Sequence, residues 1–202
     1  MPIICLFGPD GSGKTSLAKR VALTLAMRGC KVKISWMRGA HTFSSMFSRV
    51  LCRYEAFRGC NPRMISVPAK MKMVWRFIEF VSMVPVLFIR FILPDLLGFW
   101  VVAERYTPDF IVWNSIVTND ESYVESMGAK LLLSLATKTK AQIYVTADID
   151  ELNRRSCEKV EFLATQLKLY GVLAKMLNAY TLYTSHRSID DSFQEIKPLV
   201  NL

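Results

Sequence analysis

The sequence predicts an α/β fold of three layers, in which a five-stranded parallel sheet is flanked by helices. Two observations lead to this prediction. Short apolar runs rich in β-branched residues alternate with longer stretches in which apolar residues recur about every 3.6 positions. The first apolar run also leads into a glycine-rich turn and then an amphipathic stretch, which is the order strand, loop, helix. We expect residues 1–202 to form a single domain with a short lid at about residues 148–158.

The elements follow from these patterns in chain order. The expected strands are the apolar runs Ile3–Phe7, Lys31–Trp36, Phe99–Ala103, Ala141–Thr146 and Thr181–Thr184. Helical periodicity predicts helices over Lys14–Arg28, Thr42–Phe57, Lys70–Phe91, Tyr123–Thr137, Glu158–Asn178 and Ser188–Val200. Gly29 is placed to end the first helix, and Ser188 with Asp191 forms a capping pattern at the start of the last. Turn-forming residues predict loops at Gly59–Pro62 and Leu93–Asp95.

Composition places the chain among globular proteins, since 51% of its residues are hydrophobic and 21% are charged. The formal net charge is +9, from 26 Lys and Arg against 17 Asp and Glu, which favours an anionic partner. The basic residues are scattered, and no basic tract is interleaved with aromatic residues. We therefore expect nucleotide phosphates as the partner and no nucleic acid.

The cysteines and the first residues favour a cytoplasmic protein. The five cysteines are odd in number and never form a C-x-x-C pair, so we interpret them as reduced thiols in a cytosolic core. Residues Met1 to Phe7 carry no basic segment or cleavage site and lead directly into the glycine-rich turn. We interpret them as a first strand and not as a signal peptide.

The stretch from Met73 to Ala103 is rich in Phe, Val, Leu, Ile and Trp. Its longest uncharged run, Phe80 to Ile89, is only ten residues, which is too short to span a bilayer. We expect a buried helix or a helix face that joins two copies of the chain in a homodimer. Attachment to a membrane surface is the less favoured alternative.

The glycine-rich turn matches a phosphate-binding motif. Gly8-Pro9-Asp10-Gly11-Ser12-Gly13-Lys14-Thr15 fits G-x-x-x-x-G-K-[ST], the P-loop, between an apolar strand and an amphipathic helix. Its backbone N–H groups and the helix N-terminus favour a β-phosphate. Lys14 is expected to bridge the β- and γ-phosphates, and the Thr15 hydroxyl to ligate Mg²⁺. ATP and Mg²⁺ are thus the expected cofactors, held by Gly8, Asp10, Gly11, Ser12, Gly13, Lys14, Thr15 and Ser16.

Charged residues follow two later strands. Glu104 and Arg105 end the third strand, at the edge where open α/β sheets bind ligands. There Glu104 is expected to hold Mg²⁺ or accept a proton, and Arg105 to clamp an acceptor phosphate; a surface ion pair is the alternative. Arg154 and Arg155 follow the fourth strand and are expected to close over the transferring phosphoryl group. From the residues alone, a solvated basic turn explains this pair nearly as well.

Taken in order, these segments resemble the thymidylate kinase family of P-loop nucleoside monophosphate kinases over most of the chain. The phosphate loop fits the family pattern, although Phe7 replaces its usual acidic residue. Glu104-Arg105-Tyr106 is similar to the family's D-R-Y motif. After the lid, Glu158, Phe162-Leu163 and Tyr170 resemble the family's E-x-x-x-F-L and the tyrosine of the following helix.

The resemblance implies roles for single residues. Asp10 would meet the sugar 3′-hydroxyl, and Arg38 and Arg105 would clamp the acceptor phosphate. Because Gly11 and Ser12 leave the P-loop without an arginine, the lid would supply Arg154 or Arg155. The implied catalytic residues are Lys14, Glu104, Arg105, Arg154 and Arg155, with Thr15 and Glu104 at the metal. The substrate-binding set is Asp10, Arg38, His41, Phe80, Arg105, Asp109 and Trp113.

Departures from the family pattern fall on the acceptor side. Val84 stands where the family has an arginine four residues after its base-stacking phenylalanine, and Asn114 replaces a glutamine. The sequence therefore predicts an ATP-dependent nucleoside monophosphate kinase acting on dTMP or a similar acceptor. Two alternatives stay open. Glu104 is also similar to the glutamate of the deoxynucleoside kinase E-R-S motif, where it is the base. The second alternative is a nucleotide-dependent binding protein with little phosphotransfer.

Overall fold

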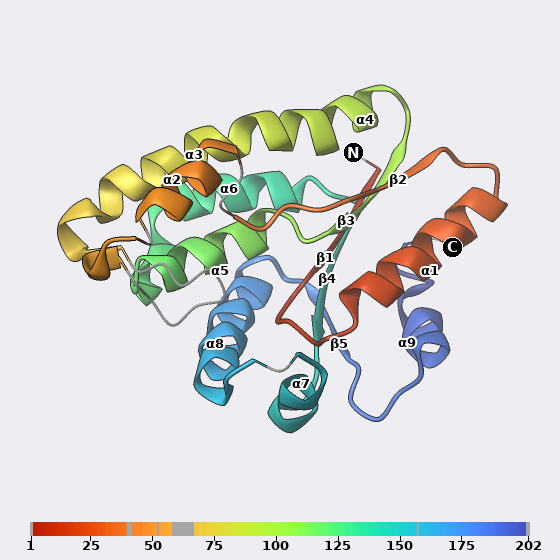
Figure 1. Cartoon of the computed structure of the whole chain (residues 1–202). Coiled ribbons are helices and arrows are strands. Elements are labelled where there is room, and N and C mark those ends of the chain that lie inside the picture. Colours follow the sequence, from red (N-terminus) through yellow and green to blue (C-terminus); the bar gives the residue numbers. More distant parts are fainter. Residues whose placement is uncertain (1, 40–41, 52, 58–66, 157, 201–202) are drawn as a thin grey trace.

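The computed structural model describes residues 2–39, 42–51, 53–57, 67–156 and 158–200 (Figure 1). Its centre is a parallel sheet of five strands in the order β2-β3-β1-β4-β5. The strands are β1 (Ile3–Phe7), β2 (Val32–Ser35), β3 (Trp100–Glu104), β4 (Ala141–Thr146) and β5 (Tyr180–Tyr183). This parallel sheet, flanked by helices, confirms the predicted fold class.

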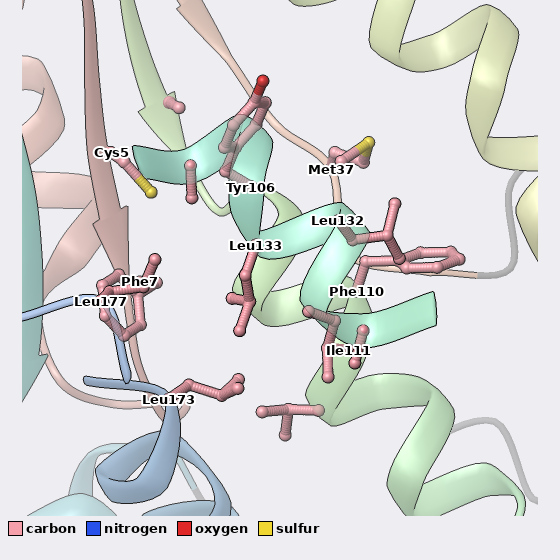
Figure 2. Packing of buried hydrophobic residues seen from close by; sticks show 14 of the residues in the cluster. Cys5, Phe7, Met37, Tyr106, Phe110, Ile111, Leu132, Leu133, Leu173 and Leu177 are labelled. Carbon is pink, nitrogen blue, oxygen red and sulfur yellow. The ribbon is translucent and has the colours of Figure 1, made fainter. Parts of the chain in front are cut away.

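Helices cover both faces of the sheet (Figure 1). They are α1 (Lys14–Met27), α2 (Thr42–Leu51), α3 (Lys72–Leu87), α4 (Leu93–Leu96), α5 (Thr107–Val117), α6 (Met127–Thr137), α7 (Ile149–Ser156), α8 (Val160–Met176) and α9 (Ile189–Ile196). On one face, Ile4 and Leu6 of β1 pack with apolar residues of α1 and α9. On the other, Cys5 and Phe7 pack with residues of α3, α5, α6 and α8 (Figure 2). Every residue of β1 is buried, as expected for a central parallel strand.

Two helices were not predicted. Helix α5 is buried on almost all sides, so its sequence has no polar face and hence no helical period. Helix α7 is short and mostly polar, and only Leu152 is buried. The prediction of a loop at Leu93–Asp95 was wrong, because these residues belong to helix α4. The predicted loop Gly59–Pro62 lies outside the described residues.

Helical structure is continuous from Ala69 to Leu96 and changes its winding after Pro85. Proline has no N–H to donate within the helix, and the segment Phe88–Ile92 is wound as a π-helix. The chain after β2 is attached here, since the Ser35 hydroxyl donates to the Arg90 carbonyl (2.7 Å) and the Arg90 guanidinium donates to the Trp36 carbonyl (2.8 Å). The helix is buried on one side only, so of the two expected alternatives it is not a wholly buried helix, and the expectation of a face that joins two copies stays a prediction.

Candidate functional site

The phosphate loop connects β1 to α1 and passes close to two neighbours. Gly8 has φ +146°, and a Cβ there would lie 2.1 Å from the Val145 carbonyl oxygen of β4. Gly11 has φ +82°, and a Cβ there would lie 2.9 Å from the Leu152 carbonyl oxygen of α7. Any other residue at either position would meet both a backbone clash and a strained conformation. The glycines thus let the loop pass between β4 and α7.

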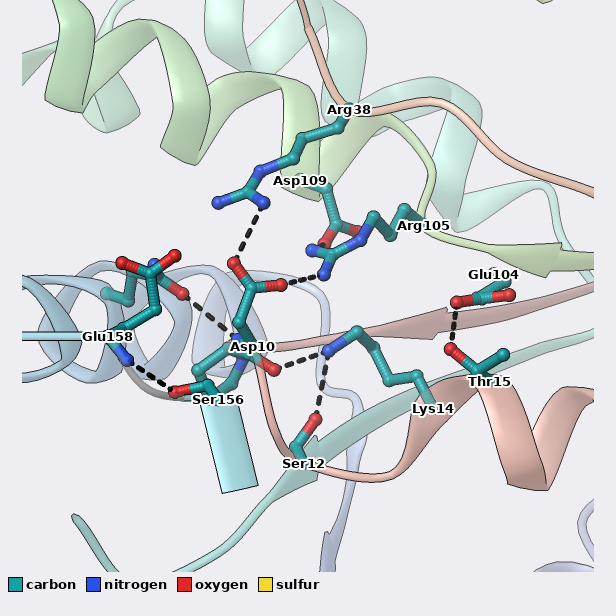
Figure 3. A network of polar contacts seen from close by, with 12 residues as sticks. Asp10, Ser12, Lys14, Thr15, Arg38, Glu104, Arg105, Asp109, Ser156 and Glu158 are labelled. Atoms are coloured by element: carbon teal, nitrogen blue, oxygen red, sulfur yellow. Dashed lines mark hydrogen bonds and ion pairs between the residues drawn. The ribbon is translucent and has the colours of Figure 1, made fainter. Parts of the chain in front are cut away.

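Lys14 is buried inside this loop (Figure 3). Its ammonium group donates to the Pro9 carbonyl (2.5 Å) and to the Ser12 hydroxyl (3.0 Å). Burial, followed by repulsion from the Arg105 guanidinium, lowers the pKa of Lys14 to about 7. The side chain therefore points at the space that the backbone N–H groups of a P-loop enclose around phosphate.

The two residues predicted to hold metal lie in contact. The Thr15 hydroxyl at the start of α1 donates a short hydrogen bond to the Glu104 carboxylate at the end of β3. Pairing of β1 with β3 brings the ends of these strands together, with Leu6 opposite Glu104. A hydroxyl and one carboxylate beside a phosphate loop suit Mg²⁺, which prefers oxygen ligands and shares them with substrate phosphates. The described residues contain no cluster of three or more His, Cys, Asp or Glu side chains suited to a metal.

Asp10 joins two arginines from different loops (Figure 3). One carboxylate oxygen lies 2.8 Å from Nη1 of Arg38, which follows β2, and the other forms a close ion pair with Arg105, which follows β3. Burial alone would raise the pKa of Asp10, but the charges of Arg105, Arg38 and Lys14 outweigh it and lower that pKa. Two guanidinium groups thus meet at one anionic point on the phosphate loop.

Arg105 is held from behind by a second carboxylate. It is buried with φ 83°, and its Nη1 lies 3.1 Å from Oδ1 of Asp109. Asp109 is fully buried, accepts a hydrogen bond from the Tyr170 hydroxyl (2.8 Å) and caps α5 by accepting from the Tyr106 N–H (3.2 Å). Burial raises the pKa of Asp109, and Arg105 opposes that shift. Asp109, expected to contact the substrate, lies behind Arg105 and positions it.

Trp113, also expected to contact the substrate, is buried and supports Arg38. The Arg38 guanidinium carbon lies 5.5 Å from the centre of the indole ring. Gly39 passes so close that a Cβ there would be 1.9 Å from Cδ1 of Trp113. The loop after β2 therefore rests on α5, which fixes the direction of Arg38.

The two lid arginines both pair with Glu151, each at 2.7 Å from Oε1, but differ in exposure and in their other contacts. The Arg154 side chain is 74% exposed and pairs with Glu151 (2.7 Å). The Arg155 side chain is 29% exposed and donates to the Thr184 carbonyl (3.2 Å), while the Thr184 hydroxyl donates to the Ser12 carbonyl of the phosphate loop (3.1 Å). Arg155 also lines a cavity of about 200 Å³ with Gly13, Ser16 and Thr184. Of the pair, Arg155 adjoins the phosphate loop.

One residue of the site was missed by sequence reasoning. Gln166 of α8 is fully buried, and its Oε1 accepts the backbone N–H of Asp10 (3.3 Å). It lies on the same side of α8 as Phe162 and Tyr170, one helical turn from each, and this spacing was the available signal. Two predicted residues are not brought into the network. Phe80 is exposed on α3 and has no described contact with Asp10, Arg38 or Arg105. His41 lies outside the described residues.

Comparisons with known proteins bear on the fold. The family model of the ATPase family associated with various cellular activities (AAA) matches residues 4–89, less than half of the chain. A search of the curated proteins gives no match. Among solved structures, thymidylate kinase from Ehrlichia chaffeensis is similar with a TM-score of 0.59 and 15% identity, over 99% of this chain and 98% of that one. At this identity the likeness shows the fold.

Proposed function

We propose that this chain, which has the fold of the P-loop NTPases, transfers the γ-phosphoryl group of ATP to a nucleoside monophosphate, either dTMP or a similar compound. The observation that carries the proposal is the meeting of Arg38 and Arg105 on one carboxylate of the phosphate loop. Guanidinium groups bind phosphate through charge-assisted, often bidentate hydrogen bonds. An acceptor phosphate that displaced Asp10 would gain both arginines and lie beside the γ-phosphate site.

The donor side supplies the remaining groups. The loop N–H groups and Lys14 would bind the β- and γ-phosphates, and Thr15 with Glu104 would hold Mg²⁺. When bound, Mg²⁺ supplies positive charge to the phosphate oxygens. Arg155, next to the loop, would offset the charge that develops during transfer, and the cavity that it lines would receive the nucleoside of ATP. In this arrangement the protein acts by positioning and charge neutralisation.

The deoxynucleoside kinase alternative needs Glu104 as a base on a substrate hydroxyl. The hydrogen bond from Thr15 to Glu104 supports the metal role instead, because the carboxylate is turned toward the phosphate loop. An acceptor without phosphate would also offer Arg38 and Arg105 no anion in exchange for Asp10, with which both arginines pair. These two observations support the monophosphate as acceptor.

The test compares acceptors and one arginine variant. ADP formation from MgATP is measured with thymidine, dTMP and other monophosphates in turn, and we expect dTMP or another monophosphate to be preferred. Arg38→Met should raise the acceptor KM by about tenfold or more, since a charge-assisted pair contributes roughly 1.5–3 kcal/mol, and leave the KM for ATP unchanged. Arg20→Met, which breaks an ion pair between Arg20 of α1 and Asp190 of α9, is the matched control.

The outcomes separate the three hypotheses. Clear preference for thymidine would identify a nucleoside kinase. Conversion of no acceptor, with ATP binding retained, would identify a binding protein. An unchanged acceptor KM in Arg38→Met would remove Arg38 from the acceptor site.

A further inference from the structure

The outer face of α3 is exposed and apolar. We use this name for Met73, Phe77, Phe80, Val81, Val84 and Phe88, all of which are exposed. They recur at spacings of three and four residues or their sums, so they lie on one side of the helix. The other side of the helix, with Met83, Leu87 and Phe91, packs in the main core. Contiguous apolar surfaces of this kind mark interaction sites.

The helix that carries this face is strongly apolar along its length. Ala69–Leu96 is long and apolar enough to cross a bilayer by length and composition alone, with a mean hydropathy of 1.9 in its most apolar window. Its inner side, however, contributes to the core that covers the sheet. A helix that is part of this core cannot also be surrounded by lipid. The arrangement therefore fits contact with a membrane surface and not a crossing.

Charge distinguishes a lipid surface from a second copy of the chain. Within residues 67–97, all described, no acidic side chain is exposed, since Glu79 is buried and Asp95 is partly buried. Exposed cations flank the face, with Lys70 near one end and Arg90, whose guanidinium also donates to the Trp36 carbonyl, near the other. On neighbouring α2 and the turn after it, Arg49 and Arg53 add two more, against one exposed acidic residue, Glu55. A second copy would present the same cations, whereas an anionic bilayer offers them opposite charge.

We propose that the outer face of α3 docks this protein on an anionic lipid surface. Phenylalanine and valine side chains would enter the boundary between headgroups and acyl chains, and the flanking lysine and arginine residues would contact the headgroups. The net charge of +9 acts in the same direction. This docking does not depend on which acceptor the chain phosphorylates.

A cavity beside the outer face of α3 also suits a lipid. Between α2 and α3 lies a cavity of about 230 Å³ whose described lining is entirely apolar, including Phe47, Val74, Trp75 and Ile78. Phe47 and Val74 are exposed, so the cavity adjoins the surface next to the outer face. A space with apolar walls favours a hydrocarbon segment over a polar ligand.

Vesicle co-sedimentation of the full chain tests the docking. Vesicles of phosphatidylcholine alone are compared with vesicles of equal parts phosphatidylcholine and phosphatidylglycerol. We expect sedimentation with the anionic vesicles, weaker with the neutral ones and reduced by salt. Phe77→Asp with Val81→Asp, at positions 68% and 43% exposed, should lower the bound fraction at least about fivefold. Leu23→Asp with Met27→Asp, at positions 53% and 80% exposed with the same spacing on α1, should leave it unchanged.

Size-exclusion chromatography and thermal unfolding of each variant complete the experiment. Equal melting temperatures of the two double variants would assign lost sedimentation to the surface and not to unfolding. The proposal is overturned if the wild type stays in the supernatant with both kinds of vesicle. It is also overturned if the wild type is a dimer that the α3 variant alone converts to monomer without any vesicle binding, because the outer face then belongs to a second copy.

Discussion

At the scale of single residues, the site is governed by charges held away from water. Lys14 is buried beside the positively charged Arg105, and these two effects lower the pKa of Lys14 from 10.5 to about 7. Asp10 shows the opposite balance, because nearby arginines outweigh its burial and lower its pKa. Lys14 is therefore the group in the phosphate loop whose protonation changes near neutral pH.

ATP binding at about pH 8 is expected to take up most of one proton. Free Lys14 is then largely neutral, and the triphosphate raises its pKa so that the bound form is protonated. Calorimetric titrations in buffers of different ionisation enthalpy measure this uptake. Lys14→Met should abolish both the uptake and phosphotransfer, whereas Lys19→Met, on the exposed side of α1, should alter neither. Equal proton uptake by Lys14→Met would disprove the assignment.

At the scale of elements, α7 decides which lid arginine can act. The helix packs on the phosphate loop at Gly11, where the loop has no side chain. In this orientation both arginines pair with Glu151, but Arg155 also donates to Thr184 next to the loop, while Arg154 extends into solvent. Of the two arginines, Arg155 is the one with described contacts to Thr184 and to the cavity beside the phosphate loop.

We expect Arg155→Met to lower kcat by more than about tenfold with a smaller effect on the KM for ATP, because a guanidinium next to the γ-phosphate acts mainly on the transition state. Arg154→Met is the matched control and should stay within about twofold of the wild type. Steady-state kinetics at saturating acceptor separates kcat from KM. The reverse result, with only Arg154→Met impaired, would mean that α7 turns on substrate binding.

At the scale of the whole molecule, the strand order separates two substrates. The central strand β1 carries the phosphate loop, and Arg38 and Arg105 follow β2 and β3 on one side of it. The cavity lined by Gly13, Arg155 and Thr184 lies toward β4 and β5 on the other side. Donor and acceptor would thus approach the loop from opposite directions, as in-line transfer requires.

A bisubstrate compound that joins adenosine and thymidine through five phosphates should therefore bind at least about tenfold more tightly than ATP or dTMP alone, because the second contact becomes intramolecular. Titration calorimetry gives the three dissociation constants. Arg38→Met should remove most of the advantage and leave ATP affinity intact. An affinity no higher than that of ATP would show that the two sites are not aligned.

The sequence was most informative where structure is local. The P-loop and the position of Glu104 and Arg105 at a strand end follow from short motifs, and parallel pairing of β1 with β3 then brings Thr15 to Glu104. Helix α5 was missed because a helix buried on almost all sides shows no polar period. The choice between Arg154 and Arg155 requires the orientation of α7.

Other contacts depend on packing between distant segments. The Arg38 guanidinium packs on the Trp113 ring, and the Asp10 N–H donates to Gln166. In each contact the two residues are more than 70 positions apart in the sequence. Spacing could place Gln166 on the same side of α8 as Tyr170, but it does not identify the distant partner of either residue. Only the resemblance to a family placed Arg38 near the acceptor.

Asp10 also makes the pair of arginines selective before any substrate arrives. Because the carboxylate is part of the same loop, its local concentration at Arg38 and Arg105 is at least in the millimolar range. A monoanion such as chloride or a small carboxylate carries no more charge than Asp10. To bind the two arginines it would have to displace the intramolecular ion pairs with Asp10. A phosphate ester with two negative charges and three free oxygens has the advantage in that exchange. In the proposed acceptor site, Asp10 would therefore favour dianionic phosphate esters over monoanions.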